Sequence, residues 1–242
     1  MKENLVIVRA GDESVHRTWF GENQNWDLIV SYYGANPLTF SESICFSAPG
    51  GKLEAVHDLL VARPDLLEGR KFIALPDDDV ASDCSSINSV FDMMRIYNLK
   101  IAQPSLAPDS FVNNKITASV PGLKLRYTNY VETMVPFFSV DVVNQLLPIF
   151  KGLRFGWGLD HLWSKIVRPE EIAIIDEIKV RHTRKQGTGP LYSEGVPLDE
   201  MRSTIRRFGA TCLPNKIVKA AISMNGEILH SRDLRQRALD LR

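Results

Sequence analysis

The chain has 242 residues, of which 44% are hydrophobic and 24% charged, as is usual for one α/β domain built around a central sheet. Lysine plus arginine and aspartate plus glutamate number 29 each, so no overall field draws the protein to nucleic acid, and no nucleic-acid partner is expected. The sequence has no apolar stretch near the roughly 20 residues of a membrane span, and its three widely spaced cysteines indicate reduced thiols in a cytoplasmic protein.

The elements predicted in chain order alternate between strands and helices. Short apolar runs predict strands at 5–8, 26–33, 71–75, 101–102 and 172–175. Apolar residues at helical spacing predict helices at 52–62, from Ser82 or Asp83 through Tyr97, and at 140–150 after Ser139. This alternation, which continues to about residue 180, favours a largely parallel sheet with helices on its faces, whose ligands bind at the carboxyl ends of the strands.

The composition changes after Lys179, where arginine and lysine become frequent. Helices are predicted near 198–208 and 215–222, so residues 186–242 are expected to form a helical extension packed on the domain of residues 1–185. The arginine-rich stretches Arg202–Arg207 and Arg232–Arg242 favour either a solvated helical face or contact with an anionic partner, including peripheral contact with a membrane surface.

Three consecutive aspartates follow the strand predicted at 71–75. Asp77, Asp78 and Asp79 come directly after Pro76, and like charges gathered there repel one another unless a cation lies between them. Mg²⁺ or Mn²⁺ suits such a site because these ions favour one or two carboxylates together with phosphate oxygens. A bound cation would also neutralise the charge that develops on a diphosphate leaving group. The alternative is a solvated acidic turn, in which one aspartate caps the backbone.

Several short segments, taken in their order and spacing, resemble an uncharacterised family of plant and bacterial proteins that is similar to GT-A glycosyltransferases. The matching segments lie within residues 5–183 and are LVIVRAGDESVHRTW, the strand with PDDD, AQPSLAPDS with a following KIT, YTNYVETMVPFFS, FGWGLDHLW and IIDEIKVRH. The resemblance fades after residue 185. It implies a Rossmann-like GT-A fold with a mostly parallel sheet and a helical C-terminal extension.

The resemblance also implies an activity and a donor site. The expected reaction moves a sugar, in the manner of a hexosyltransferase, from a nucleoside diphosphate donor such as a UDP-sugar to a hydroxyl acceptor such as a glycan, with inversion. Asp77 and Asp79 match the two ends of the D-x-D motif, and His182 matches a further ligand of Mn²⁺ or Mg²⁺. The nucleotide is expected beside Arg9, Gly11, Asp12, Asp77 and Asp78.

On the acceptor side, the resemblance assigns Asp160 as the base on the acceptor hydroxyl and places Glu132, Trp157 and Gly158 in the acceptor or sugar pocket. Here the sequence departs from many inverting enzymes, because it reads Gly158-Leu159-Asp160 instead of Glu-Asp.

Other interpretations of these residues remain open. Asp160 could cap a helix that begins at His161, Trp157 could be a core aromatic residue, and His182 could be a histidine with an ordinary structural partner. At the level of the whole protein, the alternatives are an inactive GT-A-like module that binds glycans or nucleotides, and a metal-dependent phosphohydrolase that uses the same aspartates.

Overall fold

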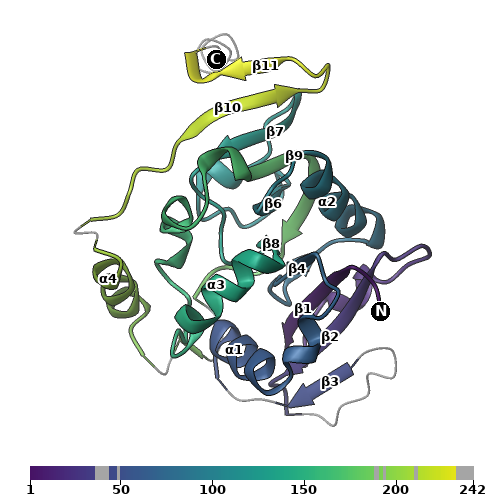
Figure 1. The fold of residues 1–242 in the computed structure, drawn as a ribbon, viewed down its shortest axis with the longest axis vertical. Helices are drawn as coiled ribbons and strands as arrows, with labels where there is room; N and C mark the ends of the chain where they lie inside the picture. Colours follow the sequence, from purple (N-terminus) through teal and green to yellow (C-terminus); the bar gives the residue numbers. More distant parts are fainter. Residues whose placement is uncertain (36–43, 48–49, 188–190, 193–194, 210–211, 233–242) are drawn as a thin grey trace.

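The computed structural model describes residues 1–35, 44–47, 50–187, 191–192, 195–209 and 212–232. One twisted sheet runs through these residues, with helices on both of its faces (Figure 1). Its strands follow the spatial order β11-β10-β7-β9-β6-β8-β4-β1-β2-β3. Their bounds are β1 Asn4–Ala10, β2 Trp26–Tyr32, β3 Ile44–Ser47, β4 Phe72–Ala74, β6 Ile101–Leu106, β7 Leu123–Thr128, β8 Phe137–Ser139, β9 Ile172–His182, β10 Val218–Ser223 and β11 Ile228–His230.

The part of the sheet formed by the N-terminal strands is parallel, as the alternation of strands and helices predicts. The strands β3, β2, β1 and β4 pair in parallel, and so do β6 and β9. The strands β7, β8 and β11 are inserted in the opposite direction, so the sheet is mixed. Every residue of β1 is buried, which is typical of a central parallel strand covered on both faces.

Alternate residues of β1 face two separate hydrophobic clusters. Val6 and Val8 belong to the cluster that contains Phe91 of α2 (Cys84–Ile96). Leu5 and Ile7 belong to the other cluster, which is formed with α1 (Lys52–Ala62) and α3 (Val140–Phe150). Because successive side chains of a strand point to opposite faces, this division places α2 on one face of the sheet and α1 with α3 on the other.

The predicted helix ends are only partly explained by side-chain capping. Asp83 caps α2, since its Oδ1 accepts a hydrogen bond from the Ser86 amide at 2.7 Å. Ser139 occupies the N-cap position of α3 but makes no capping bond with its side chain. Pro148 lies within α3, which continues to Phe150.

The helix predicted at 215–222 is wrong, because the structure forms a strand there. The strand β10 (Val218–Ser223) pairs with β7 and then with β11, so it extends the sheet, while α4 (Pro197–Arg207) is the helix predicted near 198–208. Strand preference depends on the neighbouring strand that a segment packs against, and that neighbour is about 90 residues away in the sequence. The strands predicted at 101–102 and 172–175 are also longer than expected and end at Leu106 and His182.

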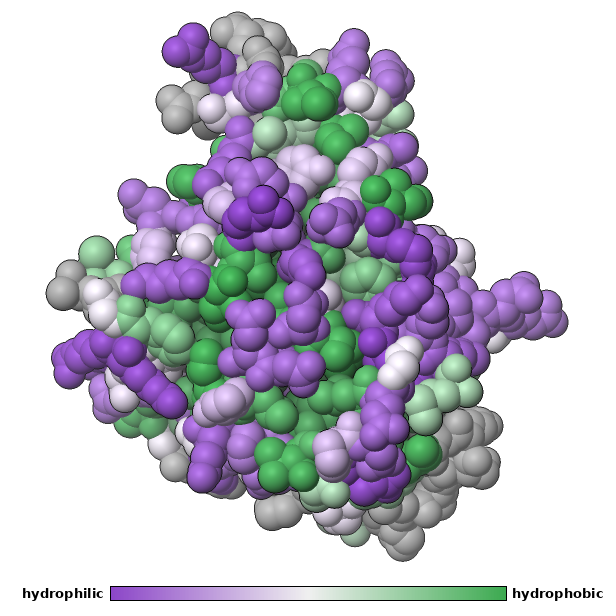
Figure 2. Space-filling view, viewed as in Figure 1, coloured by the Kyte–Doolittle hydropathy of each residue, from purple (hydrophilic) through white to green (hydrophobic). Residues whose placement is uncertain are grey.

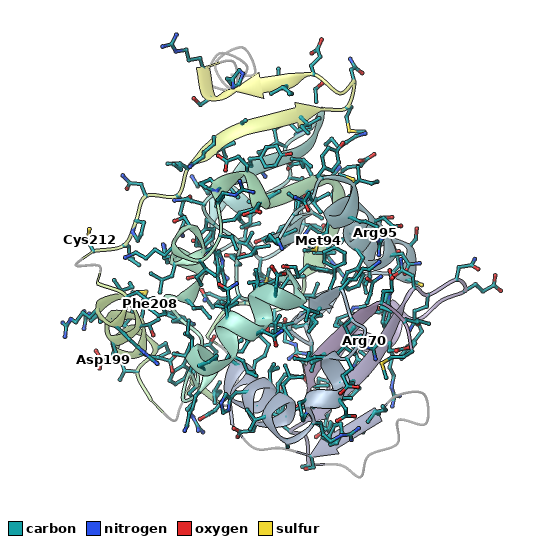
Figure 3. All side chains as sticks on the ribbon, viewed as in Figure 1. Arg70, Met94, Arg95, Asp199, Phe208 and Cys212 are labelled. Carbon is teal, nitrogen blue, oxygen red and sulfur yellow. The ribbon has the colours of Figure 1, made fainter. Side chains whose placement is uncertain are left out.

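Among the described residues, no helix is both long and apolar enough to cross a membrane. The face seen in Figure 2 mixes polar and apolar residues, with apolar ones gathered near its middle around a group of polar ones. All three cysteines are free, as predicted, and Cys212 projects at the edge of the molecule after α4 (Figure 3). Most of the predicted basic stretch Arg232–Arg242 lies outside the described residues.

Candidate active site

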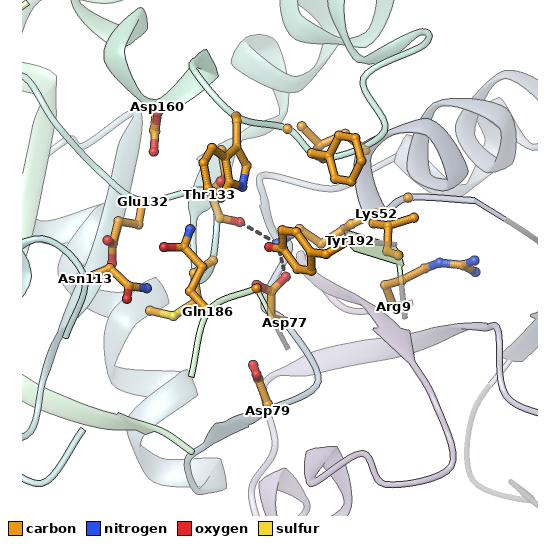
Figure 4. A pocket seen from close by; sticks show the side chains of 18 of the residues that line it. Arg9, Lys52, Asp77, Asp79, Asn113, Glu132, Thr133, Asp160, Gln186 and Tyr192 are labelled. Atoms are coloured by element: carbon orange, nitrogen blue, oxygen red, sulfur yellow. Dashed lines mark hydrogen bonds and ion pairs between the residues drawn. The ribbon is translucent and has the colours of Figure 1, made fainter. Parts of the chain in front are cut away.

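A cleft of about 850 Å³ lies at the carboxyl ends of the parallel strands. Its walls include Arg9 from the end of β1, Asp77 to Asp79 after β4, and His182 at the end of β9. Figure 4 shows Asp160 and Glu132 on the side of the cleft away from Arg9. Open α/β sheets bind their ligands at this edge, so the cleft is the candidate active site. The side near Arg9 is called the β1 end, and the side near Asp160 is called the Asp160 end.

The β1 end is held together by Arg9. Its Nη1 donates to Ser31 Oγ at 3.0 Å, and its Nη2 donates to the Gly50 carbonyl at 2.8 Å. The guanidinium carbon lies 5.1 Å from the centre of the Tyr33 ring, within the range of a cation–π contact. A backbone bridge between Arg9 and Asp77 continues the pairing of β1 with β4, which fixes the aspartates beside this arginine.

The Asp78 carboxylate is held by two donors, one just after β1 and one just after β2. Its Oδ2 accepts from the Gly11 amide at 2.8 Å and from the Tyr33 hydroxyl at 3.2 Å. The Arg184 guanidinium lies 3.6 Å from its other oxygen. Burial raises the pKa of Asp78, while the Gly11 amide and the Arg184 charge oppose that rise. Asp78 thus joins the first strand to the acidic segment.

Gly11 and Asp12, which the resemblance places at the nucleotide, make different contacts. Gly11 lies against the Tyr33 ring, and an added Cβ at Gly11 would lie 2.7 Å from that ring, so a larger residue here would displace the Tyr33 side chain. The exposed Asp12 carboxylate accepts from the Tyr32 hydroxyl and from the Ala35 amide. Both residues border the β1 end, and neither contributes a side chain to the wall of the cleft as described.

Asp77 is paired with a lysine that sequence reasoning missed. The Lys52 ammonium, at the start of α1, donates to the Asp77 carboxylate, to the Thr133 carbonyl and, at 3.1 Å, to the Leu75 carbonyl (Figure 4). Burial and the adjacent aspartates raise the pKa of Asp77, and the Lys52 charge opposes them. The sequence signal that could have pointed to Lys52 is the pair of glycines before it, Gly50 and Gly51. An added Cβ at Gly51 would lie 1.7 Å from the Arg154 carbonyl oxygen, so glycine lets the start of α1 approach the segment that contains Arg154.

Asp79 and His182 meet because a two-residue strand pairs across them. The strand β5 (Val80–Ala81) pairs antiparallel with the end of β9, where Val80 faces His182. His182 Nε2 lies 3.3 Å from Asp79 Oδ2, while Nδ1 is 2.9 Å from the Phe111 carbonyl. Burial lowers the pKa of His182, but the bonds to Asp79 and Phe111 outweigh it and raise the pKa overall.

Asp79 and His182 offer an oxygen and a nitrogen ligand of the kind that divalent cations bind, but they do not by themselves surround an ion. Within the described part of the chain, no three His, Cys, Asp or Glu side chains are grouped to hold a metal ion. Asp79 Oδ1 is buried and has no hydrogen-bond partner among the described residues. When the His182 ring is neutral and donates from Nδ1 to Phe111, its Nε2 lone pair is left free on the side of Asp79, which is the usual arrangement of a metal-binding histidine. Asp79 and His182 therefore fit a cation whose other ligands come from a phosphate ligand and water.

Asp160 lies on a glycine-bracketed turn at the other end of the cleft. Gly156 and Gly158 have φ angles of +73° and +91°, in the left-handed region that favours glycine. A short 3₁₀ helix begins at Leu159 with Gly158 as its N-cap, so Asp160 lies within it and does not cap a helix at His161. Its Oδ2 accepts from the Tyr130 hydroxyl at 2.9 Å, and burial raises its pKa to about 6.

Glu132 lies beside Asp160 and is 5% exposed. The Asn114 side-chain amide donates to its Oε1, whereas its Oε2 is buried and has no partner among the described residues. Burial raises the pKa of Glu132 to about 7, and the Asp160 charge adds to that rise. This end of the cleft therefore holds two carboxyl groups that take up protons close to neutral pH.

Trp157 is a residue of the cleft wall, as its placement between the two glycines suggests. It is half-buried, and its ring lies 6.3 Å from that of Tyr192 in an edge-to-face arrangement. Gly158 lies against α4, where an added Cβ would come 3.0 Å from the Met201 carbonyl oxygen. The residues predicted at Asp160, Glu132, Trp157 and Gly158 thus all line the cleft, and so do Tyr130, Asn114 and Lys216, which no sequence motif singles out.

Comparisons with known proteins support the fold. No protein-family model and no curated protein matches the sequence, so the uncharacterised family that its motifs resemble remains a prediction. The structure of S. aureus TarS is similar to this chain with a TM-score of 0.54 and 10% identity, over 86% of this chain and 39% of TarS. A structure of TarS 1–349 in complex with UDP-GlcNAc is similar with a TM-score of 0.51 and 12% identity, over 86% and 65%.

A third structure covers nearly the whole of both chains. Glucosyl-3-phosphoglycerate synthase from Mycobacterium tuberculosis, in complex with Mn²⁺, UDP-glucose and phosphoglyceric acid, has a TM-score of 0.54 and 13% identity, over 97% of this chain and 91% of the synthase. The chain spans about two fifths of TarS and nearly all of this synthase. At these identities the likeness shows the fold alone, and the α/β fold of the GT-A type predicted from the sequence is confirmed. Helix α4 and strands β10 and β11 form the C-terminal part, so a wholly helical extension is not supported.

Proposed function

We propose that this protein is a metal-dependent glycosyltransferase, which moves a sugar of the hexose type from a nucleoside diphosphate to a hydroxyl group of an acceptor. The observation that carries the proposal is the shared cleft: the aspartates after β4 and the buried Asp160 come from opposite walls of one pocket at the carboxyl edge of a GT-A sheet. A donor and an acceptor that meet in this pocket would have the leaving group at one end and a base at the other.

The donor nucleotide belongs at the β1 end. Arg9 offers a guanidinium there, and Arg184 and Lys52 add positive charge that favours a diphosphate. Asp77 and Asp78 line the same end of the cleft, and Gly11 and Asp12, which follow β1, are proposed to border the nucleotide. A UDP-sugar is our choice of donor because two of the similar structures are complexes with UDP-GlcNAc and UDP-glucose. Trp157 and Gly158 are placed to contact the sugar or the acceptor.

Asp79 and His182, with Asp77 next to them, are the residues that would hold Mn²⁺ or Mg²⁺. When bound, the ion supplies positive charge to the departing diphosphate. The chain's part is to hold His182 Nε2 within 3.3 Å of Asp79 Oδ2, and to balance Asp77 with the Lys52 ammonium.

Asp160 is the proposed base. Its carboxylate takes the proton of the acceptor hydroxyl, the acceptor oxygen forms a bond to the anomeric carbon, and the bond from that carbon to the diphosphate breaks, which inverts the configuration. A pKa of about 6 leaves most of Asp160 ionised at neutral pH. It also makes this carboxylate a stronger base than an ordinary aspartate, which favours proton transfer from the acceptor hydroxyl. Glu132 lines the same cleft and is the second carboxyl group at the end where the acceptor would bind.

The proposal is tested with Asp79→Asn and titration calorimetry. We expect the wild-type protein to bind UDP in the presence of Mn²⁺, and Asp79→Asn to bind it roughly 10- to 100-fold more weakly, because one charged ligand contact of about 1.5–3 kcal/mol is lost. Asp109→Asn, an exposed aspartate away from the cleft, is the control and should bind UDP normally.

A panel of UDP-, GDP- and CMP-sugars with Mn²⁺ then separates the possible activities. A transferase leaks sugar slowly to water, so free sugar should accumulate with at least one donor. Hydrolysis of simple phosphate esters without any action on nucleotide sugars would instead identify a phosphohydrolase. Nucleotide binding without donor turnover, in the presence of a broad set of sugar acceptors, would identify a binding module.

A further inference from the structure

The segment that precedes β10 reaches back into the Asp160 end of the cleft. Hydrogen bonds hold it on both sides of Lys216: Asn129 Nδ2 donates to the Asn215 carbonyl at 2.8 Å, the Ile217 amide donates to Asn129 Oδ1 at 2.9 Å, and Thr128 Oγ1 donates to the Ile217 carbonyl at 2.8 Å. Lys216 therefore has a fixed backbone position on this wall, although it belongs to the part of the chain where the family resemblance has faded.

The Lys216 ammonium makes two contacts that lead to the two buried carboxyl groups. It donates to Asn114 Oδ1, and the Asn114 amide in turn donates to Glu132. It also lies 4.2 Å from the centre of the Tyr130 ring, whose hydroxyl donates to Asp160. Lys216 thus contacts both Asn114 and Tyr130, the two residues that donate hydrogen bonds to Glu132 and Asp160.

Lys216 is the cation whose charge lowers the pKa of Asp160, and the charges of Asp160 and Glu132 act in turn on Lys216. Asp160 is faced by Tyr130, Glu132, His161 and Lys216, and Glu132 is faced by Asn114, Thr117, Asp160 and, at longer range, His182. Burial lowers the pKa of His161 to about 4, so this ring is neutral at neutral pH. Burial lowers the pKa of Lys216, while the charges of Asp160 and Glu132 oppose that change.

We propose that Lys216 is a positioning residue of the transfer reaction, which keeps Asp160 ionised and fixes Asn114 and Tyr130 so that both carboxyl groups face the acceptor. This inference rests on the proposed function, because it assigns Lys216 to the site where Asp160 acts as the base. It gives the C-terminal segment a chemical role in addition to its strands. The acceptor end would then be complete only when residues 215–217 are docked.

The test compares Lys216→Met, Lys216→Gln and Lys216→Arg with the control Lys219→Met, an exposed lysine in β10. Without the ammonium, the pKa of Asp160 rises, so the acidic limb of the kcat/KM profile moves to higher pH. For a rise of about one pH unit, the loss at pH 6 is about fivefold and nearly vanishes by pH 8. Lys216→Arg should restore most of the activity at pH 6, and UDP affinity should not change in any variant.

A second measurement does not depend on turnover. Carbon-13 NMR titration of the side-chain carboxyl groups, with Asp160→Asn used for assignment, should show the Asp160 resonance titrating at higher pH in Lys216→Met and Lys216→Gln. An equal loss of activity at every pH, or an unshifted Asp160 titration, overturns the role of Lys216. Failure of the wild-type protein to bind UDP with Mn²⁺ overturns the proposed function instead, while the NMR titration still decides whether Lys216 controls Asp160.

Discussion

The two ends of the cleft contrast in how they are built. At the β1 end, three aspartates follow one another after a single strand, and each has a neighbour that fixes it: Lys52 for Asp77, the Gly11 amide for Asp78 and His182 for Asp79. At the Asp160 end, the polar residues come from four separate stretches of the chain and are joined by hydrogen bonds between side chains.

This difference predicts different consequences of mutation. The β1 end depends on backbone geometry and should fail as a unit, with loss of ligand binding or of stability. The Asp160 end depends on side-chain charge and should lose turnover or change its pH dependence while the fold and donor binding persist.

The largest expected effect is that of Asp160→Asn. The amide cannot accept the proton of the acceptor hydroxyl, so kcat should fall by about 10²–10⁴-fold. UDP binding, measured by calorimetry with Mn²⁺, should match that of the wild-type protein because Asp160 lies at the other end of the cleft. An Asp160→Asn enzyme with normal turnover would remove the base assignment, and a simultaneous loss of UDP binding would show that the two ends are not independent.

The next effect tests the backbone of the β1 end through Gly51→Ala. The added Cβ would lie 1.7 Å from the Arg154 carbonyl oxygen, so the start of α1 must move away from the opposite wall. We expect the free energy of unfolding to fall by about 1–3 kcal/mol, with weaker UDP binding as Lys52 moves. Chemical denaturation measures the first quantity and calorimetry the second.

Gly152→Ala is the matched control for that variant. Its φ of +73° is strained for alanine, but an added Cβ would meet no atom within 4 Å, so the expected cost is about 1–2 kcal/mol without any change in UDP affinity. Equal UDP affinities in the Gly51→Ala and Gly152→Ala variants would contradict the idea that the close packing of Gly51 holds Lys52 in place for UDP binding.

The smallest effect is a shift in pH dependence with Tyr130→Phe. The Tyr130 hydroxyl donates to the ionised Asp160 carboxylate at 2.9 Å, so it favours the charged form and lowers the pKa that burial has raised. Its removal should raise the pKa, and activity should be lost at a higher pH as the solution is acidified. The expected displacement of the acidic limb of kcat/KM is about one pH unit or less.

Tyr127→Phe, in β7 and away from the cleft, is the control for Tyr130→Phe. Its acidic limb should coincide with that of the wild-type enzyme. A Tyr130→Phe profile that also coincides with the wild type would mean that Asp160 does not set the limb.

Much of the fold could be predicted because its signals are local. The run LVIV, the helical spacing after Gly51 and the apolar positions between Ile87 and Met94 each indicate an element within a few residues of its observed bounds. The segment 215–222 was mistaken for a helix because its strand exists through pairing with β7, which a sequence window does not contain. The same limitation applies to β9, whose continuation beyond Asp176 to His182 depends on pairing with β5 and β6.

The sequence by itself determined the elements and the acidic segment, because short-range patterns of apolar residues and a run of three aspartates are visible without any partner. Only the tertiary structure decided that Lys52 balances Asp77, that Asp79 meets His182, and that Lys216 stands behind Asp160 and Glu132. The physical reason is that charges and hydrogen bonds act across space: the side chains that pair here are separated by 25 residues of chain for Lys52 and Asp77 and by 102 for Lys216 and Asn114.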